Sequence, residues 1–442
     1  MDAKAAASFR ITHARVFSIA GPAMLANLTT PLLGLVATAA VGPLGEAHLI
    51  GGVALAAIVF DGIYWLFGFL RMGTVALTAQ ALGAGDAAEQ RAVLSRALLL
   101  AAIIGTALVV LQVPLAALTS DLLGGSDAVR QAAQTYFFVR IWSAPFTLGN
   151  LTLIGWLTGI ARATTALALQ IVVNAINIAL TVLFVLWLDF GIAGAALAAV
   201  LAEAIGLVAG LAVAWRRLGH RFETSAAIVL QRSQLMRMLV VNRDIMIRTA
   251  CVIGAFAFFA AQGARAGDTA LAANAVLHNF VLIGSFFLDG MATAAEQLCG
   301  RSVGARDRSA FVQATRLALG WGLGFGIACT MIFLLAGSAL IDVMTTNAEV
   351  RRFANDFLVF AAVAPVLGAL AYTYDGVFIG ATWSRDMRNL MLVAFALYLG
   401  SWWALRGYGN AGLWVAILVF LATRGALQAA RYPALVRATF RA

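Results

Sequence analysis

The chain has 442 residues, of which 62% are hydrophobic and only 11% charged, and its formal net charge is +10. Because soluble domains carry about 25% charged residues, this composition excludes an ordinary soluble enzyme. Apolar runs of about 20 residues recur along the whole chain, and each can cross a ~30 Å hydrocarbon layer as a helix. The runs are continuous rather than alternating, so they predict membrane-spanning helices and not a β-barrel.

The apolar runs predict an all-α integral membrane protein with twelve transmembrane helices. In chain order, their approximate limits are residues 16–41, 49–80, 93–118, 133–156, 164–188, 191–214, 237–262, 271–299, 313–337, 354–379, 388–405 and 409–430. Six spans fall in each half. We therefore expect an N-terminal six-helix lobe at 1–214, a cytoplasmic linker at 215–236 and a C-terminal six-helix lobe at 237–442.

The two halves repeat at an offset of 221 residues, which is half of the 442-residue chain. At this offset Gly83-Ala84-x-Asp86 aligns with Gly304-Ala305-x-Asp307, and Gly155 and Gly159 align with Gly376 and Gly380. Several matches at one offset indicate an internal duplication. An even number of spans gives both halves one orientation, so a pseudo-two-fold axis should run along the membrane normal, with a cavity between the halves.

Basic residues gather in the connections on one side of the predicted membrane. The 215–236 connection alone contains Arg216, Arg217, Arg221 and Arg232. The positive-inside rule then places both termini and this connection in the cytoplasm of a multi-pass protein of the bacterial inner membrane. The net charge is thereby explained by topology, so we expect no nucleic-acid partner. The expected partners are a small organic substrate and membrane lipids, and the expected state is a monomer.

An ionisable residue inside a membrane span has a high free-energy cost and usually has a functional role. Five acids in the predicted spans are candidates for proton or cation coupling: Asp61, Glu203, Asp289, Glu296 and Asp375. Five arginines also lie in or near spans: Arg71, Arg140, Arg248, Arg316 and Arg424. The sequence shows no metal cluster, catalytic triad or nucleotide-binding signature. We therefore expect no enzyme and no cofactor, with energy supplied by a gradient of H⁺ or Na⁺.

Asp61, Tyr64 and Trp65 share one helix face, since they stand at i, i+3 and i+4. A carboxylate beside aromatic rings suits a proton and an organic cation. The alternative is that Asp61 pairs with an arginine for structure alone.

Asp289 and Glu296 lie two turns apart on one face of the eighth span. Two carboxylates in a low dielectric raise each other's proton affinity, which suits proton exchange. The alternative is an ion pair between Glu296 and Arg248 or Arg301.

Asp375 stands near Tyr372 and directly before Gly376, with Gly380 one turn further on. The glycines form a small-xxx-small pair, which favours close helix packing. Asp375 and Tyr372 are candidates for handling a proton or substrate.

Uncharged polar residues in the N-terminal half could line a substrate cavity or join helices. They are Asn27, Asn150, Asn174, Asn177 and Thr181. Asn174, Asn177 and Thr181 form one stripe at helical spacing.

Several segments resemble the multidrug and toxic compound extrusion (MATE) family, within it the branch of DNA-damage-inducible protein F. They include Thr30-Pro-Leu-Leu-Gly-Leu-Val36, Phe69-Leu-Arg-Met-Gly73, Asn242-Arg-Asp-Ile-Met246 and Asp375-Gly-Val-Phe-Ile-Gly-Ala-Thr382. The resemblance implies twelve helices in two lobes that open as a V. It also implies alternating access and export of organic, often cationic, compounds in exchange for H⁺ or Na⁺.

The sequence departs from the family pattern at two acidic positions. Where the pattern has Asp after Leu-Gly-Leu-Val, this chain has Ala37, and where the fifth span has Asp, it has Thr181. The N-terminal half thus lacks both carboxylates that the resemblance would assign to the cation. Coupling has either moved to Asp61, Glu203 or the C-terminal half, or it is lost.

Three other functions remain open at this stage. A lipid-linked precursor flippase of the wider superfamily would need extra spans and a cationic cavity. A major-facilitator carrier would have a Gly-x-x-x-Asp-Arg-x-Gly-Arg loop, which the 83–91 segment does not match. An uncoupled or non-transporting relative would show no ligand-dependent flux.

Overall fold

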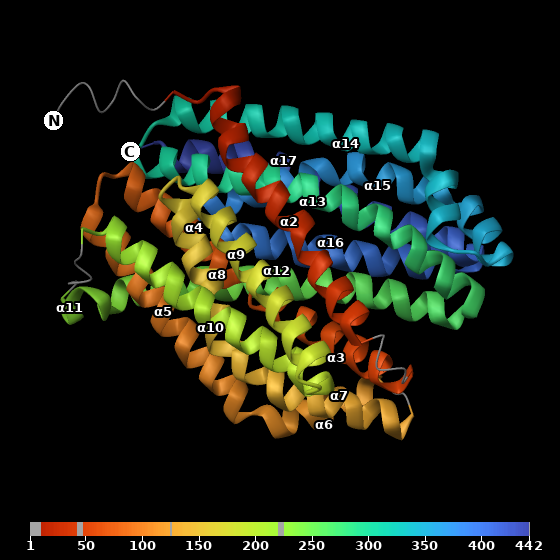
Figure 1. The fold of residues 1–442 in the computed structure, drawn as a ribbon. Helices are drawn as coiled ribbons and strands as arrows, with labels where there is room; N and C mark the ends of the chain where they lie inside the picture. The colour runs from red at the N-terminus through yellow and green to blue at the C-terminus, as the bar shows by residue number, and fades with distance from the viewer. Residues whose placement is uncertain (1–9, 42–46, 124–125, 220–224, 442) are drawn as a thin grey trace. The chain divides into compact units, whose positions relative to one another are not determined.

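A computed structural model describes residues 10–41, 47–123, 126–219 and 225–441, and within these ranges it contains helices and no strand. Figure 1 shows the helices along the chain. Their bounds are α2 (His13–Val41), α3 (Ala47–Leu66), α4 (Phe69–Gly83), α5 (Ala87–Val110), α6 (Gln112–Leu123), α7 (Asp127–Arg140), α8 (Ala144–Gly159), α9 (Ala163–Val182), α10 (Gly191–Arg217), α11 (Ala226–Val229), α12 (Arg232–Arg265), α13 (Asp268–Gly304), α14 (Arg308–Met344), α15 (Ala348–Gly380), α16 (Ser384–Leu405) and α17 (Gly409–Thr439). Short helical turns, η2 (Ile141–Ser143), η3 (Leu183–Trp187) and η4 (Arg406–Tyr408), join some of them.

Ten helical stretches of the described chain are long and apolar enough to span a membrane. The last stretch, Ser384–Thr439, contains two of the helices, α16 and α17. Helix α2, with 29 largely apolar residues, supplies one more span. The predicted twelve-helix, all-α membrane fold is confirmed.

The chain divides into two compact units. The N-terminal unit consists of Leu25–Leu82 and Asp86–Leu239. The C-terminal unit consists of Val240–Ala442 together with Met1–Met24 and Gly83–Gly85. The main passage from one unit to the other thus falls inside α12, while the domain limits predicted around a 215–236 linker stay a prediction.

Equivalent helices of the two halves end at the predicted offset of 221 residues. Helix α4 ends at Gly83 and α13 at Gly304, and α8 ends at Gly159 and α15 at Gly380. The caps repeat too, since Asp86 accepts a hydrogen bond from the Glu89 amide (2.8 Å) and Asp307 one from the Ala310 amide (2.9 Å). The structure therefore shows the same local design in both halves.

Close helix contacts repeat at the same offset. A Cβ added at Gly155 would meet the backbone of Arg71, and one added at Gly376 would meet the backbone of Ala292. Gly380 likewise faces the Glu296 carbonyl, as predicted for a small-xxx-small pair. Glycine is needed here because the backbones approach too closely for any side chain.

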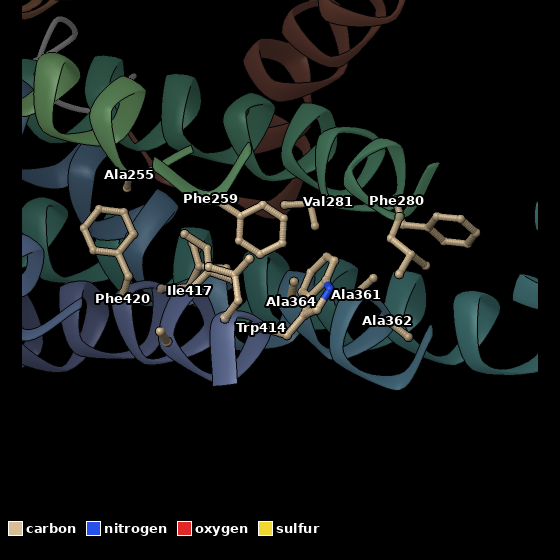
Figure 2. Close-up of a cluster of buried hydrophobic side chains, with 14 of the residues drawn as sticks. Ala255, Phe259, Phe280, Val281, Ala361, Ala362, Ala364, Trp414, Ile417 and Phe420 are labelled. Carbon is tan, nitrogen blue, oxygen red and sulfur yellow. The ribbon is translucent and has the colours of Figure 1, made fainter. Parts of the chain in front are cut away.

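Each unit has its own packing of helices. In the C-terminal unit α13, α14 and α15 pack side by side, and α17 packs against α15 and α16 (Figure 1). Figure 2 shows the apolar cluster inside this unit, where Phe259, Trp414 and Phe420 lie among alanines. In the N-terminal unit α10 packs on α7, α8 and α9, and Trp156 is buried in an apolar cluster of this unit. The Trp156 indole donates a hydrogen bond to the Gln90 carbonyl (3.0 Å).

Short helix α11, in the connection between the halves, is fastened to the N-terminal unit by Arg96. This side chain is only 2% exposed. It donates to the carbonyls of Ile228 (2.7 Å) and Val229 (3.0 Å) and pairs with Glu89 (2.7 Å). Because the guanidinium satisfies two carbonyls at the end of α11, this part of the connection is held and not free.

Candidate functional site

A polar cluster lies inside the N-terminal unit, where α3, α7, α8 and α10 supply its side chains. The Tyr64 hydroxyl of α3 lies 2.8 Å from the Ser143 hydroxyl of η2. The Asn150 amide of α8 donates to the Glu203 carboxylate of α10 (2.7 Å) and to the Glu203 carbonyl (2.8 Å). The structure therefore brings together three of the predicted site residues, Tyr64, Asn150 and Glu203.

Arg140, at the end of α7, supplies the positive charge of this cluster. Its guanidinium carbon lies 5.8 Å from the ring centres of both Phe60 and Tyr64. It also interacts electrostatically with the carboxylates of Asp61 and Glu203. Its buried Nη1 atom has no hydrogen-bond acceptor among the described residues. The guanidinium of Arg140 thus interacts with both carboxylates of the cluster.

The two acids of the cluster are open to their surroundings. Asp61 is exposed and Glu203 is half-buried, although both lie on apolar helices. An ionised carboxylate facing lipid is costly. These positions are therefore suited to a face that water or a polar solute can reach.

The predicted Asp375 site is a buried, ion-paired cluster formed by α12, α15 and α17 of the C-terminal unit. Asp375 on α15 is 3% exposed. Its Oδ2 atom pairs with Arg248 of α12 and with Arg424 of α17 (2.7 Å). Its Oδ1 atom accepts a hydrogen bond from the Gln428 amide (2.7 Å). Both carboxylate oxygens are therefore occupied by side chains of the protein.

Asp289 and Tyr372 border this cluster. Asp289 on α13 is half-buried and interacts electrostatically with Arg248 and Tyr372. The Tyr372 ring lies against the Arg424 guanidinium, with 5.6 Å between guanidinium carbon and ring centre. Glu296 on α13 is 2% exposed, and Arg248, one of the two arginines that the sequence offered as its partner, pairs with Asp375.

The uncharged candidates of the N-terminal unit are distributed among helix contacts. Asn174 donates to the Thr29 hydroxyl (3.2 Å) and so joins α9 to α2. The Thr181 hydroxyl donates to the Asn177 side chain within α9 (3.3 Å). Asn27 is half-buried on α2, and Trp65 on α3 is 45% exposed. The side-chain surroundings of Ala37, also on α2, lie outside the described part of the chain.

Arg424 and Gln428 belong to the C-terminal cluster, yet sequence reasoning gave neither a role. The 221-residue offset could have found the arginines. It places Arg424 at the position of Glu203, and Arg248 at the position of Asn27. The two halves thus carry opposite charge at one equivalent position.

The MatE family profile matches residues 22–183 and 244–400, one match in each half of the chain. The chain belongs to the MatE family. It is 37% identical over 416 residues to "DNA damage-inducible protein F" of Escherichia coli K12, which covers 94% of this chain and 91% of that one. It is also 26% identical over 434 residues to a "Probable multidrug resistance protein NorM" of Caulobacter vibrioides, covering 91% of this chain and 87% of the relative.

Solved structures have the same fold as this MatE protein. A crystal structure of a MATE transporter in a bent conformation has a TM-score of 0.87 over 97% of this chain and 96% of that one, at 20% sequence identity. The family resemblance predicted from the sequence is confirmed. MatE proteins are transporters for multidrug and toxic compound efflux, so this chain is a multi-pass membrane transport protein.

Proposed function

We propose that this MatE protein is a secondary exporter that exchanges organic compounds for protons, with Asp61 and Glu203 as its coupling carboxylates. The observation that carries the proposal is the cluster of two acids around one arginine in the N-terminal unit. Neither acid occupies the positions of Ala37 and Thr181, where the family pattern has its carboxylates. Coupling has therefore moved within the same half of the chain.

Protons fit this cluster better than sodium ions. A bound Na⁺ needs several oxygen ligands and would lie close to the permanent charge of Arg140, which repels it. A proton bound to Asp61 or Glu203 needs no such set of oxygen ligands. Once one acid is protonated, the other carboxylate still balances the Arg140 guanidinium.

Asp375 is a poor coupling residue for the same physical reason. Two guanidiniums and one amide hold both of its oxygens, so a proton would have to displace them. Breaking a buried ion pair is strongly unfavourable. We therefore assign Asp375 to the architecture of the C-terminal unit and not to proton exchange.

Exchange follows from competition at the N-terminal acids. When Asp61 or Glu203 releases its proton, the cluster gains negative charge and favours a substrate with a positive or hydrogen-bonding group. When the acid takes up a proton, that attraction is lost and substrate is released. The distribution of Arg and Lys supports a bacterial inner-membrane location with both termini in the cytoplasm, where inward protons would drive export.

Reconstituted full-length protein tests the proposal. Efflux of a fluorescent organic cation from proteoliposomes would be driven in turn by an imposed proton gradient and by a sodium gradient. Asp61→Asn and Glu203→Gln should abolish the proton-driven component while exchange of labelled for unlabelled substrate continues. Glu349→Gln, at an exposed acid on α15, is the matched control. Sodium-driven flux, or full proton coupling in both amide variants, would refute the assignment.

A further inference from the structure

We propose that the amide of Asn150 makes the N-terminal acid cluster selective for protons over sodium ions. Its N–H groups occupy two oxygens of Glu203 that a metal ion would need, whereas a proton needs only one oxygen. The inference rests on the proposed function for the step from ion binding to coupled export. It adds to the two acids a residue that determines which ion can use them.

Two hydrogen bonds join the Asn150 amide of α8 to Glu203 of α10. The amide nitrogen lies 2.7 Å from the Glu203 carboxylate and 2.8 Å from the main-chain carbonyl oxygen of the same residue. Both neighbours are acceptors, so the NH₂ group of the amide faces them and its carbonyl does not. Asn150 is only 5% exposed, so these bonds lie away from bulk water.

The two hydrogen bonds discriminate between ions by the number of oxygens that each ion requires. A sodium ion binds through oxygen lone pairs and is repelled by the positive end of an N–H bond. At Glu203 it would have to displace the Asn150 amide from both the carboxylate and the carbonyl. A proton forms one covalent O–H bond, for which the second carboxylate oxygen of Glu203 is enough.

Packing on α10 holds the Asn150 amide in this position. A Cβ added at Gly206, one turn after Glu203, would lie 3.1 Å from the amide nitrogen of Asn150 and 3.6 Å from its oxygen. The same Cβ would also collide with Val173 of α9. The amide therefore lies directly against the α10 backbone, and the absence of a side chain at Gly206 makes this approach possible.

The amide oxygen of Asn150 favours the proton as well. This Oδ1 atom is buried and has no hydrogen-bond donor among the described residues. It is a single neutral acceptor, and the charge of Arg140 acts on the same carboxylate of Glu203 and repels a metal ion. A protonated Glu203 can instead donate its O–H group to Oδ1. A buried acceptor thereby gains the donor that it lacks.

Aspartate at this position should reverse the selectivity. It has nearly the size of asparagine, but it offers two acceptor oxygens and no donor when ionised. Asn150→Asp would therefore free the Glu203 carboxylate and carbonyl from their N–H groups. It would also add a second carboxylate beside them, so that several oxygens and an excess of negative charge face the positive charge of Arg140.

Thermal unfolding of the full-length protein in nanodiscs tests the proposal, with sodium chloride exchanged for choline chloride at constant ionic strength. An ion that binds only the folded state raises the melting temperature as its concentration exceeds the dissociation constant. We expect the wild-type melting temperature to be independent of sodium. That of Asn150→Asp should rise with sodium, at concentrations at least about tenfold below any that affect the wild type. In proteoliposomes the same variant should gain sodium-driven efflux.

Three further variants control the test. Thr147→Asp adds the same charge one turn earlier on α8 and keeps the Asn150 amide, so it should gain no comparable sodium response. Adding Glu203→Gln to Asn150→Asp should remove the response, since it removes one of the carboxylates. Asn150→Ala frees the same Glu203 oxygens without a new charge and should respond more weakly, which keeps the test valid if Asn150→Asp does not fold.

The proposal is overturned if wild type responds to sodium as strongly as Asn150→Asp, or if neither Asn150 variant responds. An equal response of Thr147→Asp would also overturn it, because added charge and not the amide would then set the selectivity. Sodium binding is measured here without transport. A wild type without proton-driven efflux would therefore refute the proposed function, while a sodium response confined to the Asn150 variants would still support the role of the amide.

Discussion

Replacing Asp375 by asparagine should destabilise the C-terminal unit strongly. The substitution removes the negative charge between Arg248 and Arg424, whose side chains are 9% and 2% exposed. It also turns an amide NH₂ group toward guanidinium donors. Removing one partner of a buried ion pair costs about 3–5 kcal/mol, because the remaining charge is left uncompensated.

The size of this effect translates into a melting temperature. Unfolding entropy is about 2.1 cal/mol/K per residue, so the C-terminal unit of about 230 residues gives ~0.5 kcal/mol/K. A loss of about 3–5 kcal/mol then lowers the melting temperature by roughly 6–10 °C. The matched control is Asp342→Asn, because Asp342 and Arg351 form a more exposed pair (3.3 Å) in the same unit.

Thermal unfolding of purified protein in one detergent, followed by tryptophan fluorescence, measures both variants. The Asp342→Asn control should shift the melting temperature by no more than ~2 °C, since exposed ion pairs contribute about 0–1 kcal/mol. If Asp375→Asn unfolds at the same temperature as this control, the buried cluster does not hold the unit together. The structural role assigned to Asp375 would then be wrong.

Two further predictions concern the repeated features of the halves. Gly380→Val should lower the free energy of unfolding by at least about 1–3 kcal/mol and reduce the yield of folded protein, because the new side chain meets the Glu296 carbonyl. Gly320→Ala, at a position with open space around it, should have no effect. Size-exclusion chromatography of both variants measures the yield. At Asp307, the hydrogen bond from the backbone amide of Ala310 lowers the carboxyl pKa below its ordinary 3.8. The ionised carboxylate therefore stabilises the protein fully above pH 3.8. This stabilisation disappears as the pH falls through the lowered pKa. The melting temperatures of wild type and Asp307→Ala should therefore differ at pH 6 and converge as the pH falls below 3.8 through the lowered value, and a constant difference would contradict this.

Hydrophobic run length was sufficient to predict the fold. A bilayer needs about 20 apolar residues per helix, and the predicted spans coincide with helices of the structure. The small-xxx-small spacing also predicted close helix packing at Gly376 and Gly380, and the 221-residue offset aligned them with Gly155 and Gly159. These features depend on local sequence and on a repeated pattern, so one chain is enough to detect them.

The site was only partly predictable, because pairing depends on which helices meet. The free-energy cost of an ionisable group in a membrane span identified Asp61, Glu203 and Asp375 as candidates. The structure shows a charged partner for each. The sequence could not show that Arg248 pairs with Asp375, since the two residues lie on different helices. Gln428 was not identified, because the sequence does not show that its amide lies beside Asp375.

The ratio of acids to arginines suggests how many protons each transport cycle moves. In the N-terminal cluster Arg140 balances one of Asp61 and Glu203, so the second acid keeps a negative charge that a proton can neutralise. In the C-terminal cluster Arg248 and Arg424 balance Asp375 and Asp289, and no acid is left over. We therefore expect one exchangeable proton per cycle. Measuring the proton gradient that just balances a known substrate gradient gives this number, and a value of two would mean that Arg140 does not neutralise either acid.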